Sequence, residues 1–303
     1  MFVAFDINFN SELFFLTGDN KEHYRKKYRA KAAQVKSAFY GNLFDIIENK
    51  YINGQTIQRN WFPVLENIDV FLSHSHMDIN DVTAFAGWLQ ENLGVKVFID
   101  SELWGNIEEL EHTLEELVNK PAYVDRHGKV YDYANTRRFF QHTNAMLSIA
   151  LEQMMDAAEV MFFLNSNQSI PIRTNDSMNA TYSPWIYTEI ACSKILRRKP
   201  LICYRDVRRY RNQLLEESVV IAKRLEEDFF NYIIVHPLDL EHLIKLTVDD
   251  LRKLNLNYID NQSDGLTSLD ILYESKYNAG WYEFISHLRL DDKTINKIRG
   301  AFL

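Results

Sequence analysis

One stretch, residues 68–105, constrains the fold of this chain more than any other: IDVFLSHSHMDINDVTAFAGWLQENLGVKVFIDSELWG. Residues 68–73 and 95–99 are short apolar runs rich in β-branched and aromatic side chains, which is typical of buried strands. Between them, residues 81–93 carry apolar side chains at helical spacing, and Gly94 is the kind of residue that commonly ends a helix. A strand, a helix and a strand with short connections predict a βαβ unit with parallel strands and a right-handed crossover.

Short apolar strands continue to alternate with helices after this unit. We expect further strands over residues 159–164, 200–204 and 232–236, and helices over residues 106–120, 144–158, 185–196 and 207–229. Residues 121–140 are expected to form an inserted loop, and residues 165–184 a long loop. The pattern predicts an α/β fold with a flavodoxin-like, doubly wound, five-stranded parallel sheet of order 2-1-3-4-5. In that order the chain reverses between strands 1 and 3, so a ligand is expected beyond their carboxyl ends.

The expected strands lie in the middle of a chain of 303 residues. We therefore expect a main domain over residues 65–240, an N-terminal extension over residues 1–64 and a helical C-terminal extension over residues 241–303. The N-terminal extension contains a basic amphipathic helix that begins near residue 20. We interpret it as a helix that packs on the main domain with a solvated basic face, and an anion-binding helix is the alternative.

The composition of the chain limits which partners and which cellular compartment we expect for it. The net charge of −8 argues against nonspecific nucleic-acid binding, because an acidic surface does not neutralise a phosphate backbone. Two cysteines, Cys192 and Cys203, cannot build a disulfide framework, which favours a reducing compartment. No apolar run reaches the length of a membrane span, and the first residues lack the basic and apolar regions of a secretory signal. We expect a soluble, cytoplasmic protein that binds neither nucleic acid nor membrane.

Polar side chains crowd the loop after the strand at residues 68–73. They are Ser73, His74, Ser75, His76 and Asp78. His-x-His-x-Asp has the chemistry of a zinc site and resembles part of the metallo-β-lactamase signature. However, Ile79 stands where that family has another histidine, and the alternation of strands and helices differs from that family's run of strands. We expect instead that this loop offers backbone and hydroxyl donors to a ribose or a phosphate, without a metal.

Glu189 is the carboxylate that the expected topology places best. It lies one helical turn after Trp185, so the two side chains share a face of their helix. An indole beside a carboxylate forms an apolar wall on which an aromatic ring can stack. The alternative is a surface glutamate next to a core tryptophan, and the spacing alone does not decide between them. The chain has no G-x-G-x-x-G after the first strand, no P-loop and no G-x-S-x-G elbow, which disfavours the common redox, NTPase and hydrolase chemistries.

Several of these segments, in this order, resemble a Toll/interleukin-1 receptor (TIR) domain. IDVFLSHSHMD, the next helix and VKVFIDSELWG resemble its first half, in which an aspartate opens the so-called BB loop, here residues 100–105. EVMFFLNSNQS resembles its third strand, and SPWIYTEIACSKILRRKPLI resembles the following helix and the fourth strand. The resemblance covers roughly residues 66–206. The insertion near residues 121–140 and the long loop before Trp185 depart from the family pattern.

The resemblance implies a function and a set of site residues. In catalytically active TIR domains the glutamate four residues after the tryptophan is the catalytic residue of NAD⁺ cleavage, and that position falls on Glu189. The implied substrate-binding residues are Ser73, His74, Ser75, Asp100, Trp104 and Trp185. Bacterial TIR proteins of this kind resemble the signal-producing component of antiphage systems such as Thoeris. NAD⁺ is then a substrate rather than a cofactor, and an ADP-ribose-type product is the signal that a downstream effector senses.

Two other functions remain open at this point. Many TIR domains are assembly adaptors that act through BB-loop contacts, here residues 101–104, and self-association is expected for catalytic members as well. An adaptor does not need the tryptophan–glutamate pair, which this chain has. Trp104 could contact a partner or pack under the loop. The third possibility is a related enzyme that cleaves the glycosidic bond of free nucleosides or nucleotides.

Overall fold

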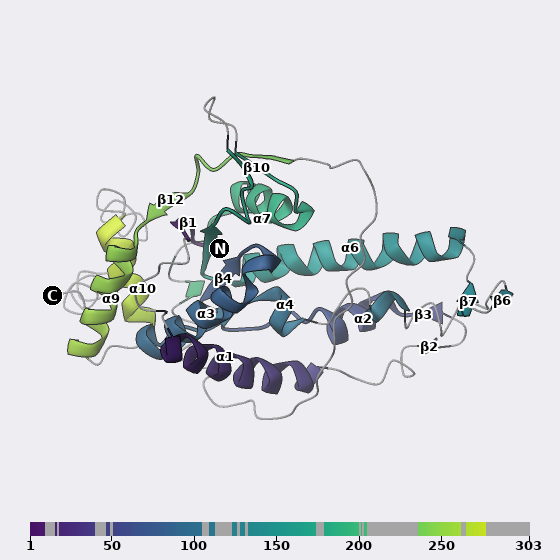
Figure 1. The fold of residues 1–303 in the computed structure, drawn as a ribbon, viewed down its shortest axis with the longest axis horizontal. Coiled ribbons are helices and arrows are strands. Elements are labelled where there is room, and N and C mark those ends of the chain that lie inside the picture. Colours follow the sequence, from purple (N-terminus) through teal and green to yellow (C-terminus); the bar gives the residue numbers. More distant parts are fainter. Residues whose placement is uncertain are drawn as a thin grey trace.

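The protein contains a five-stranded parallel sheet with helices on both faces (Figure 1). The structure is a computed structural model, and it describes residues 1–9, 16, 18–39, 47–48, 51–104, 109–112, 123–125, 128–130, 133–173, 179–199, 201, 203–204, 236–261 and 265–276. The expected α/β class and the five parallel strands are confirmed. None of the described helices is long and apolar enough to cross a membrane.

The strand order of the sheet is β12-β1-β8-β4-β5. These strands are β12 (Ile244–Leu246), β1 (Val3–Asn8), β8 (Val160–Asn165), β4 (Val70–Ser73) and β5 (Val97–Phe98). The expected order 2-1-3 for the first half of the sheet is confirmed, because β4 lies between β5 and β8 with both pairs parallel. All four residues of β4 and all six of β8 are buried, as expected of strands covered on both faces.

The other half of the sheet differs from the expectation. In the range 200–204, Leu201 lies in a turn and Cys203 and Tyr204 are helical, while residues 200 and 202 lie outside the described part. In the range 232–236, only His236 is described, and it begins β11 (His236–Leu238) of a small antiparallel sheet. β1 and β12 occupy these two places instead. The reason is pairing length: β1 pairs with β8 along all six residues, whereas residues 200–204 begin with a proline, which cannot donate a ladder hydrogen bond.

This topology changes the expected domain division. β1 lies inside the expected extension 1–64, and β12 lies inside the expected extension 241–303. Both strands belong to the main sheet, so boundaries at residues 64 and 240 run through it. The ends of the described chain therefore contribute to the same core as its centre.

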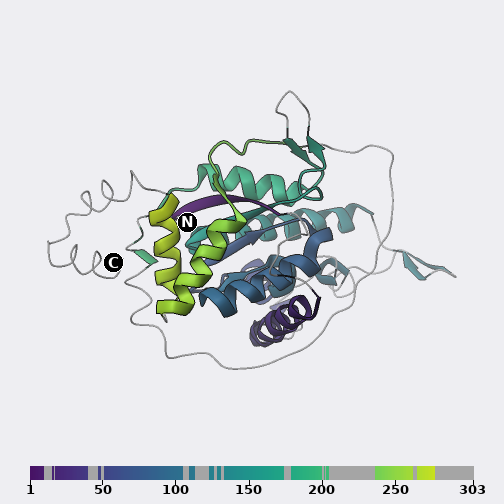
Figure 2. The same ribbon diagram turned by 60° about the vertical axis from the view of Figure 1, so that its left-hand side comes forward.

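One face of the sheet is covered by α1, α3, α9 and α10 (Figure 1, Figure 2). These are α1 (Gly18–Phe39), α3 (Ile79–Leu93), α9 (Val248–Asn261) and α10 (Gly265–Lys276). Phe5 of β1 stacks on Tyr273 of α10, with the ring centroids 6.5 Å apart. After β12 the described residues 248–261 and 265–276 are helical and cover this face; residues 262–264 and 277–303 lie outside the described part.

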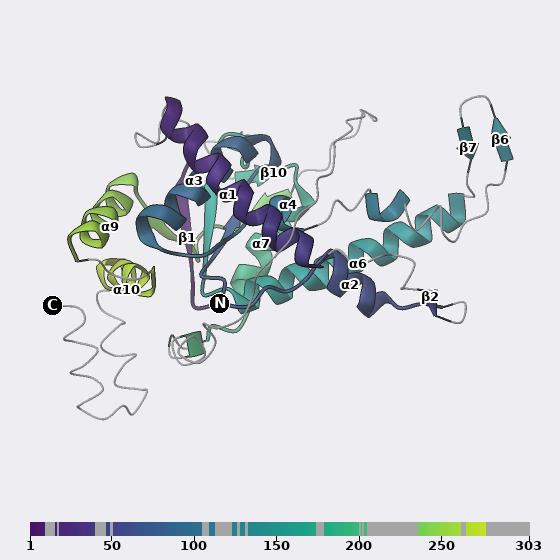
Figure 3. The same ribbon diagram turned by 90° about the horizontal axis from the view of Figure 1, so that it is seen from below.

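The opposite face carries α6 (Tyr133–Ala157) and α7 (Pro184–Ile195) (Figure 1). The smaller elements are β2 (Ile47–Glu48), β3 (Tyr51–Ile52), α2 (Gly54–Trp61), the 3₁₀ helix η2 (His76–Asp78), α4 (Asp100–Leu103), β6 (Tyr123–Asp125), β7 (Gly128–Val130), β9 (Ile172–Arg173) and β10 (Asn179–Thr181). The expected loop at residues 121–140 instead holds the β6–β7 hairpin and the start of α6 (Figure 3), and the expected loop at residues 165–184 holds β9 and β10.

The expected helices agree with the structure where it describes them. α3 ends at Gly94, whose φ of 67° is left-handed, as the sequence predicts. In the range 106–120 only residues 109–112 are described, and they are helical. The expected helix at residues 207–229 lies outside the described part.

The basic helix α1 packs along α3, as expected for this segment (Figure 3). Its basic residues face acidic side chains of neighbouring helices rather than solvent alone. Lys27 Nζ lies 2.7 Å from an oxygen of Glu91, and Arg29 pairs with Glu102 at 2.9 Å. Tyr28, which is fully buried, donates a hydrogen bond of 3.1 Å to the Val97 carbonyl. The positive charge of α1 is therefore partly neutralised within the fold, which does not favour an anion-binding role.

Candidate functional site

A single row of side chains crosses the sheet at its carboxyl end. The registers pair Ser73 of β4 with Phe163 of β8, Phe163 with Asp6 of β1, and Asp6 with Lys245 of β12. Residues in register on neighbouring strands project to the same face, so all four side chains lie on the α7 face of the sheet. Three of the four are polar, which is uncommon on the buried face of a parallel sheet.

Glu189 contacts this row from α7, the helix that covers this face of the sheet. The sequence places it well inside α7: Ser183 is the N-cap and accepts a hydrogen bond from the Ile186 amide, and Pro184 occupies the first turn. The Glu189 side chain is 4% exposed. Ser73 Oγ donates a hydrogen bond of 2.5 Å to Glu189 Oε2. This hydrogen bond joins the end of β4 to the helix that follows β8.

The carboxyl group of Glu189 has an unusual electrostatic environment. Burial raises its pKa well above the usual range, and the nearby carboxylate of Asp100 raises the pKa further. The hydrogen bond from Ser73 acts in the opposite direction, because it stabilises the charged form. Asp100 begins α4 directly after β5 and is partly buried. A carboxylate from a different element is thus close enough to raise the pKa of Glu189, and such perturbed carboxyl groups are typical of functional sites.

The remaining polar residues of the expected binding loop mostly shape the loop. His74 Nδ1 lies 3.1 Å from the Leu72 carbonyl oxygen, and His74 Nε2 lies 3.5 Å from Ser101 Oγ. Ser75 caps η2 by accepting a hydrogen bond from the Met77 amide. Across the described residues, no three His, Cys, Asp or Glu side chains group in a way that could hold a metal ion.

Asp78 ties this loop to the end of β8. Its Oδ2 accepts a hydrogen bond of 2.5 Å from Ser166 Oγ. Burial raises the pKa of Asp78, the neighbouring charge of Asp81 raises it further, and Ser166 and His74 lower it. The carboxyl group therefore joins the loops after β4 and β8, the two strands whose carboxyl ends flank the expected ligand crevice.

Trp104 requires a correction. Its side chain is 3% exposed, and its indole Nε1 donates a hydrogen bond of 2.9 Å to the Pro63 carbonyl. The ring packs edge-on against Phe62 and Phe98, with centroids 5.8 and 5.1 Å apart. Trp104 is thus a core residue under the chain after β5, and we remove it from the candidate substrate-binding set. Trp185 is only partly buried, packs against the core and lies one turn from Glu189, so it stays in the set.

Sequence reasoning missed a second group of polar residues on the same face. Asp6, Asn165, Arg173 and Lys245 line two adjoining hollows of about 420 and 570 Å³. They surround the carboxyl ends of β12, β1 and β8. They were missed because β1 and β12 were not expected in the sheet. A sequence signal did exist, since Asp6 is a lone charge inside the apolar strand VAFDIN.

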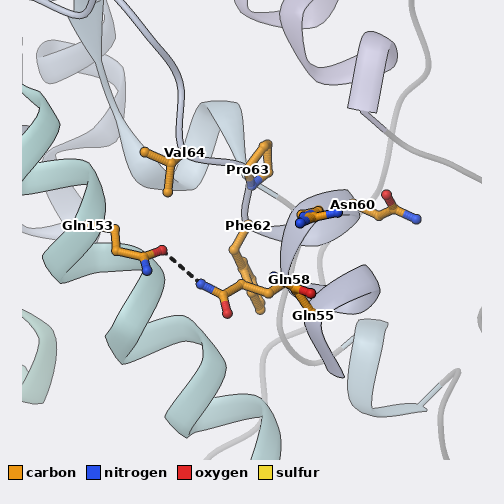
Figure 4. A pocket seen from close by; sticks show the side chains of 8 residues that line it. Gln55, Gln58, Asn60, Phe62, Pro63, Val64 and Gln153 are labelled. Carbon is orange, nitrogen blue, oxygen red and sulfur yellow. Dashed lines mark hydrogen bonds between the residues drawn. The ribbon is translucent and has the colours of Figure 1, made fainter. Parts of the chain in front are cut away.

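A third hollow, of about 530 Å³, lies elsewhere (Figure 4). Its lining consists of Gln55, Gln58, Arg59, Asn60, Phe62, Pro63, Val64 and Gln153. Gln58 Nε2 donates a hydrogen bond of 3.0 Å to Gln153 Oε1 across it (Figure 4). Three of the lining residues, 62–64, lie in the segment that leads into β4, so this hollow lies toward the amino end of that strand, away from Glu189. Apart from Arg59, its lining side chains are amides or apolar groups, and they include no carboxylate, histidine, hydroxyl or thiol.

A comparison of this chain with protein-family models, with curated proteins and with solved structures finds no match. The geometry of the site and the sequence motifs therefore carry the functional interpretation.

Proposed function

We propose that this chain is a TIR-like NAD⁺ glycohydrolase or ADP-ribosyl cyclase in which Glu189 is the catalytic carboxylate. One observation carries the proposal: a buried carboxyl group, hydrogen-bonded by Ser73, lies at the carboxyl ends of β4 and β8. The chain connections of these strands run to opposite faces of the sheet, which is where open α/β sheets bind ligands. The tryptophan–glutamate spacing of the TIR resemblance agrees with this position.

The chemistry of NAD⁺ cleavage suits a single carboxylate. The bond between C1′ of the ribose and the nicotinamide nitrogen breaks, and its electron pair leaves with nicotinamide. Nicotinamide departs as a neutral molecule from a cation, so no general acid is needed. The positive charge that develops on the ribose resembles an oxocarbenium ion, and an adjacent carboxylate stabilises it. Attack by water, with loss of a proton, gives ADP-ribose; attack by a nitrogen of the adenine ring gives a cyclised product.

The raised pKa of Glu189 is consistent with a cationic substrate. In the free protein, burial and Asp100 favour the protonated form of this carboxyl group. A positively charged pyridinium ring next to it favours the carboxylate instead. Ionisation of Glu189 is then coupled to substrate binding. Because the side chain is 4% exposed, substrate entry also requires neighbouring side chains to move apart.

Assembly is part of the proposal. Large apolar side chains are exposed near the site: Met77 in η2 is 79% exposed, Tyr182 is 47% exposed and Tyr187 is 42% exposed. Exposed apolar side chains of this kind suit contacts between copies of the chain. They equally suit an adaptor without catalysis, which is the second candidate function. In the proposed enzyme, the ADP-ribose-type product is the signal sensed by a downstream effector in antiphage defence.

The test is incubation of the purified protein with NAD⁺, with separation of nicotinamide, ADP-ribose and cyclised products. We compare the wild-type protein with Glu189→Ala and repeat the assay at high protein concentration. Nicotinamide release that depends on Glu189 supports the enzyme, and the co-product identifies hydrolysis or cyclisation. Release of the base from free nucleosides or nucleotides, without nicotinamide release from NAD⁺, favours the related glycosidic-bond enzyme. No release at any concentration favours the adaptor.

Two substitutions are expected to shift the pH dependence of cleavage in opposite directions. The active form contains ionised Glu189, so kcat/KM should rise with pH on the acidic limb. Ser73→Ala removes a hydrogen bond that stabilises the carboxylate, so the limb should move to higher pH. Asp100→Asn removes a like charge, so the limb should move to lower pH. The measurement is kcat/KM for NAD⁺ against pH; shifts in the same direction for both variants contradict the assigned electrostatics.

A further inference from the structure

We propose that the hollow at the carboxyl ends of β12, β1 and β8 is a subsite for a nucleoside diphosphate, the half of a dinucleotide that is distal to the bond cleaved. Arg173 and Lys245 bind the diphosphate, and Asp6 accepts hydrogen bonds from the ribose hydroxyls. This inference rests on the proposed function, since it assigns the second half of the same substrate.

The spacing between the two parts of the site fits one extended ligand. Ser73, Phe163, Asp6 and Lys245 occupy consecutive strands of one row. With about 4.8 Å between neighbouring strands, Asp6 lies about 10 Å from Ser73 and Lys245 about 14 Å. Phe163, between them, is fully buried, so the side chains that cover it must move apart, as those around Glu189 must, before one ligand can span both parts. A dinucleotide with one ribose beside Glu189 would direct its diphosphate along this row.

Arg173 is held in position by the carboxyl end of β8. Its Nη2 donates hydrogen bonds of 2.6 Å to Asn165 Oδ1 and 3.0 Å to the Ser166 carbonyl. A guanidinium has five N–H donors, and both of these hydrogen bonds use one nitrogen. The side chain itself is exposed at the hollow, as is that of Lys245. A fixed guanidinium and a lysine that line the same polar hollow are a common arrangement for phosphate recognition.

Asp6 supplies the complementary acceptor. Its Oδ1 is buried and has no hydrogen-bond partner among the described residues. Burial raises the pKa of Asp6, while a hydrogen bond with Asn165 and the charges of Lys245 and Arg173 lower it. A buried acceptor without a partner is costly, so it indicates a ligand donor. Acidic side chains commonly accept hydrogen bonds from ribose hydroxyls in dinucleotide sites of α/β sheets.

The carboxyl groups that line the hollow favour a nucleotide over an inorganic anion as its ligand. Asp239 and Glu241 also line the larger hollow, and Asp239 pairs with Lys194 of α7. Three carboxyl groups therefore share the hollow with two cationic groups that face it. A free inorganic anion gains from the two cations alone. A ligand with both phosphate oxygens and hydroxyl donors uses the cations and Asp6 together, which favours a nucleoside diphosphate.

The test is calorimetric titration of the full chain with ADP, which lacks the nicotinamide half. We expect Arg173→Ala and Lys245→Ala each to weaken ADP binding about 10-fold or more, the effect of losing one charge-assisted hydrogen bond. Lys27→Ala is the matched control, because it removes an equal charge from α1 on the other face of the sheet. Absence of ADP binding to the wild-type protein, or equal binding by the folded Arg173 and Lys245 variants, overturns the proposal.

A second titration tests the role of Asp6. Asp6→Asn should weaken ADP binding but not pyrophosphate binding, because pyrophosphate has no ribose. Pyrophosphate binding should become tighter if it changes, since the variant removes a negative charge beside Arg173 and Lys245. Pyrophosphate that binds the wild-type protein as tightly as ADP does overturns the ribose assignment. Thermal unfolding of each variant checks that it is folded.

Kinetics separate this inference from the proposed function. If NAD⁺ is cleaved, Arg173→Ala and Lys245→Ala should raise KM about 10-fold and change kcat little. NAD⁺ cleavage with unchanged KM in both variants rejects the subsite and keeps the function. ADP binding that requires both cations, in a protein that releases no nicotinamide, keeps the subsite and rejects the function.

Discussion

Replacement of Glu189 by glutamine is expected to reduce nicotinamide release from NAD⁺ by about 10³-fold or more, the scale of losing one preorganised charge at a reacting centre. Glutamine has nearly the same size, and its carbonyl oxygen can still accept the hydrogen bond from Ser73. What it removes is the negative charge that stabilises the oxocarbenium-like ribose. The loss should appear mainly in kcat, because this charge interacts most strongly with the transition state. The measurement is initial nicotinamide release under saturating NAD⁺.

The same variant provides its own folding control. The folded-state pKa of Glu189 lies above its unfolded value, so the native state binds more protons in the window between them. The stability contributed by this group is complete below the unfolded pKa and is lost as the pH rises toward the folded pKa. Glu189→Gln should therefore have a higher Tm than the wild-type protein at pH 8, with a smaller difference near pH 4. An inactive variant with a raised Tm excludes misfolding, whereas a variant with full activity removes Glu189 from the mechanism.

The sequence is sufficient to predict the part of the fold that depends on local patterns. β4, α3, Gly94 and β5 follow one another with short connections, so periodicity and one glycine determine them. Pro184 and Ser183 likewise mark the start of α7 and thus the position of Glu189. The contact between Ser73 and Glu189 then follows from where parallel strands end.

The other half of the sheet depends on which segments, distant in sequence, pair with β8. Local sequence patterns do not determine that pairing. Residues 200–204 are as apolar as β1, yet β1 is the segment that matches β8 along its whole length. This choice brings Asp6 and Lys245 to the site from opposite ends of the described chain. The same applies to the single side chain of Trp104. It packs in the core rather than at the rim of the site because it contacts Phe62, which is distant in sequence.

The close contact between α1 and α3 makes Gly87 the position in the described chain where we expect one added methyl group to destabilise the fold strongly. A Cβ built on Gly87 would lie 2.7 Å from the carbonyl carbon of Tyr24 in α1, and closer still to its oxygen. Backbone atoms cannot rotate away as a side chain can, so α1 would have to shift. Such a shift disturbs the buried hydrogen bond from Tyr28 to the Val97 carbonyl and the ion pair between Lys27 and Glu91.

We therefore expect Gly87→Ala to lower the free energy of unfolding by about 2 kcal/mol or more, although alanine is the better helix former, because overpacking costs more than the gain in propensity. For a chain of this size, the Tm should fall by about 3–4 °C or more. Gly54→Ala is the matched control: its Cβ would meet only Met146 Sδ at 3.7 Å, an ordinary contact, so its Tm should be unchanged or slightly raised. Chemical and thermal unfolding measure both variants. If Gly87→Ala were as stable as Gly54→Ala, the docking of α1 against α3 would be wrong, and with it the assignment of residues 18–39 to the core of the fold.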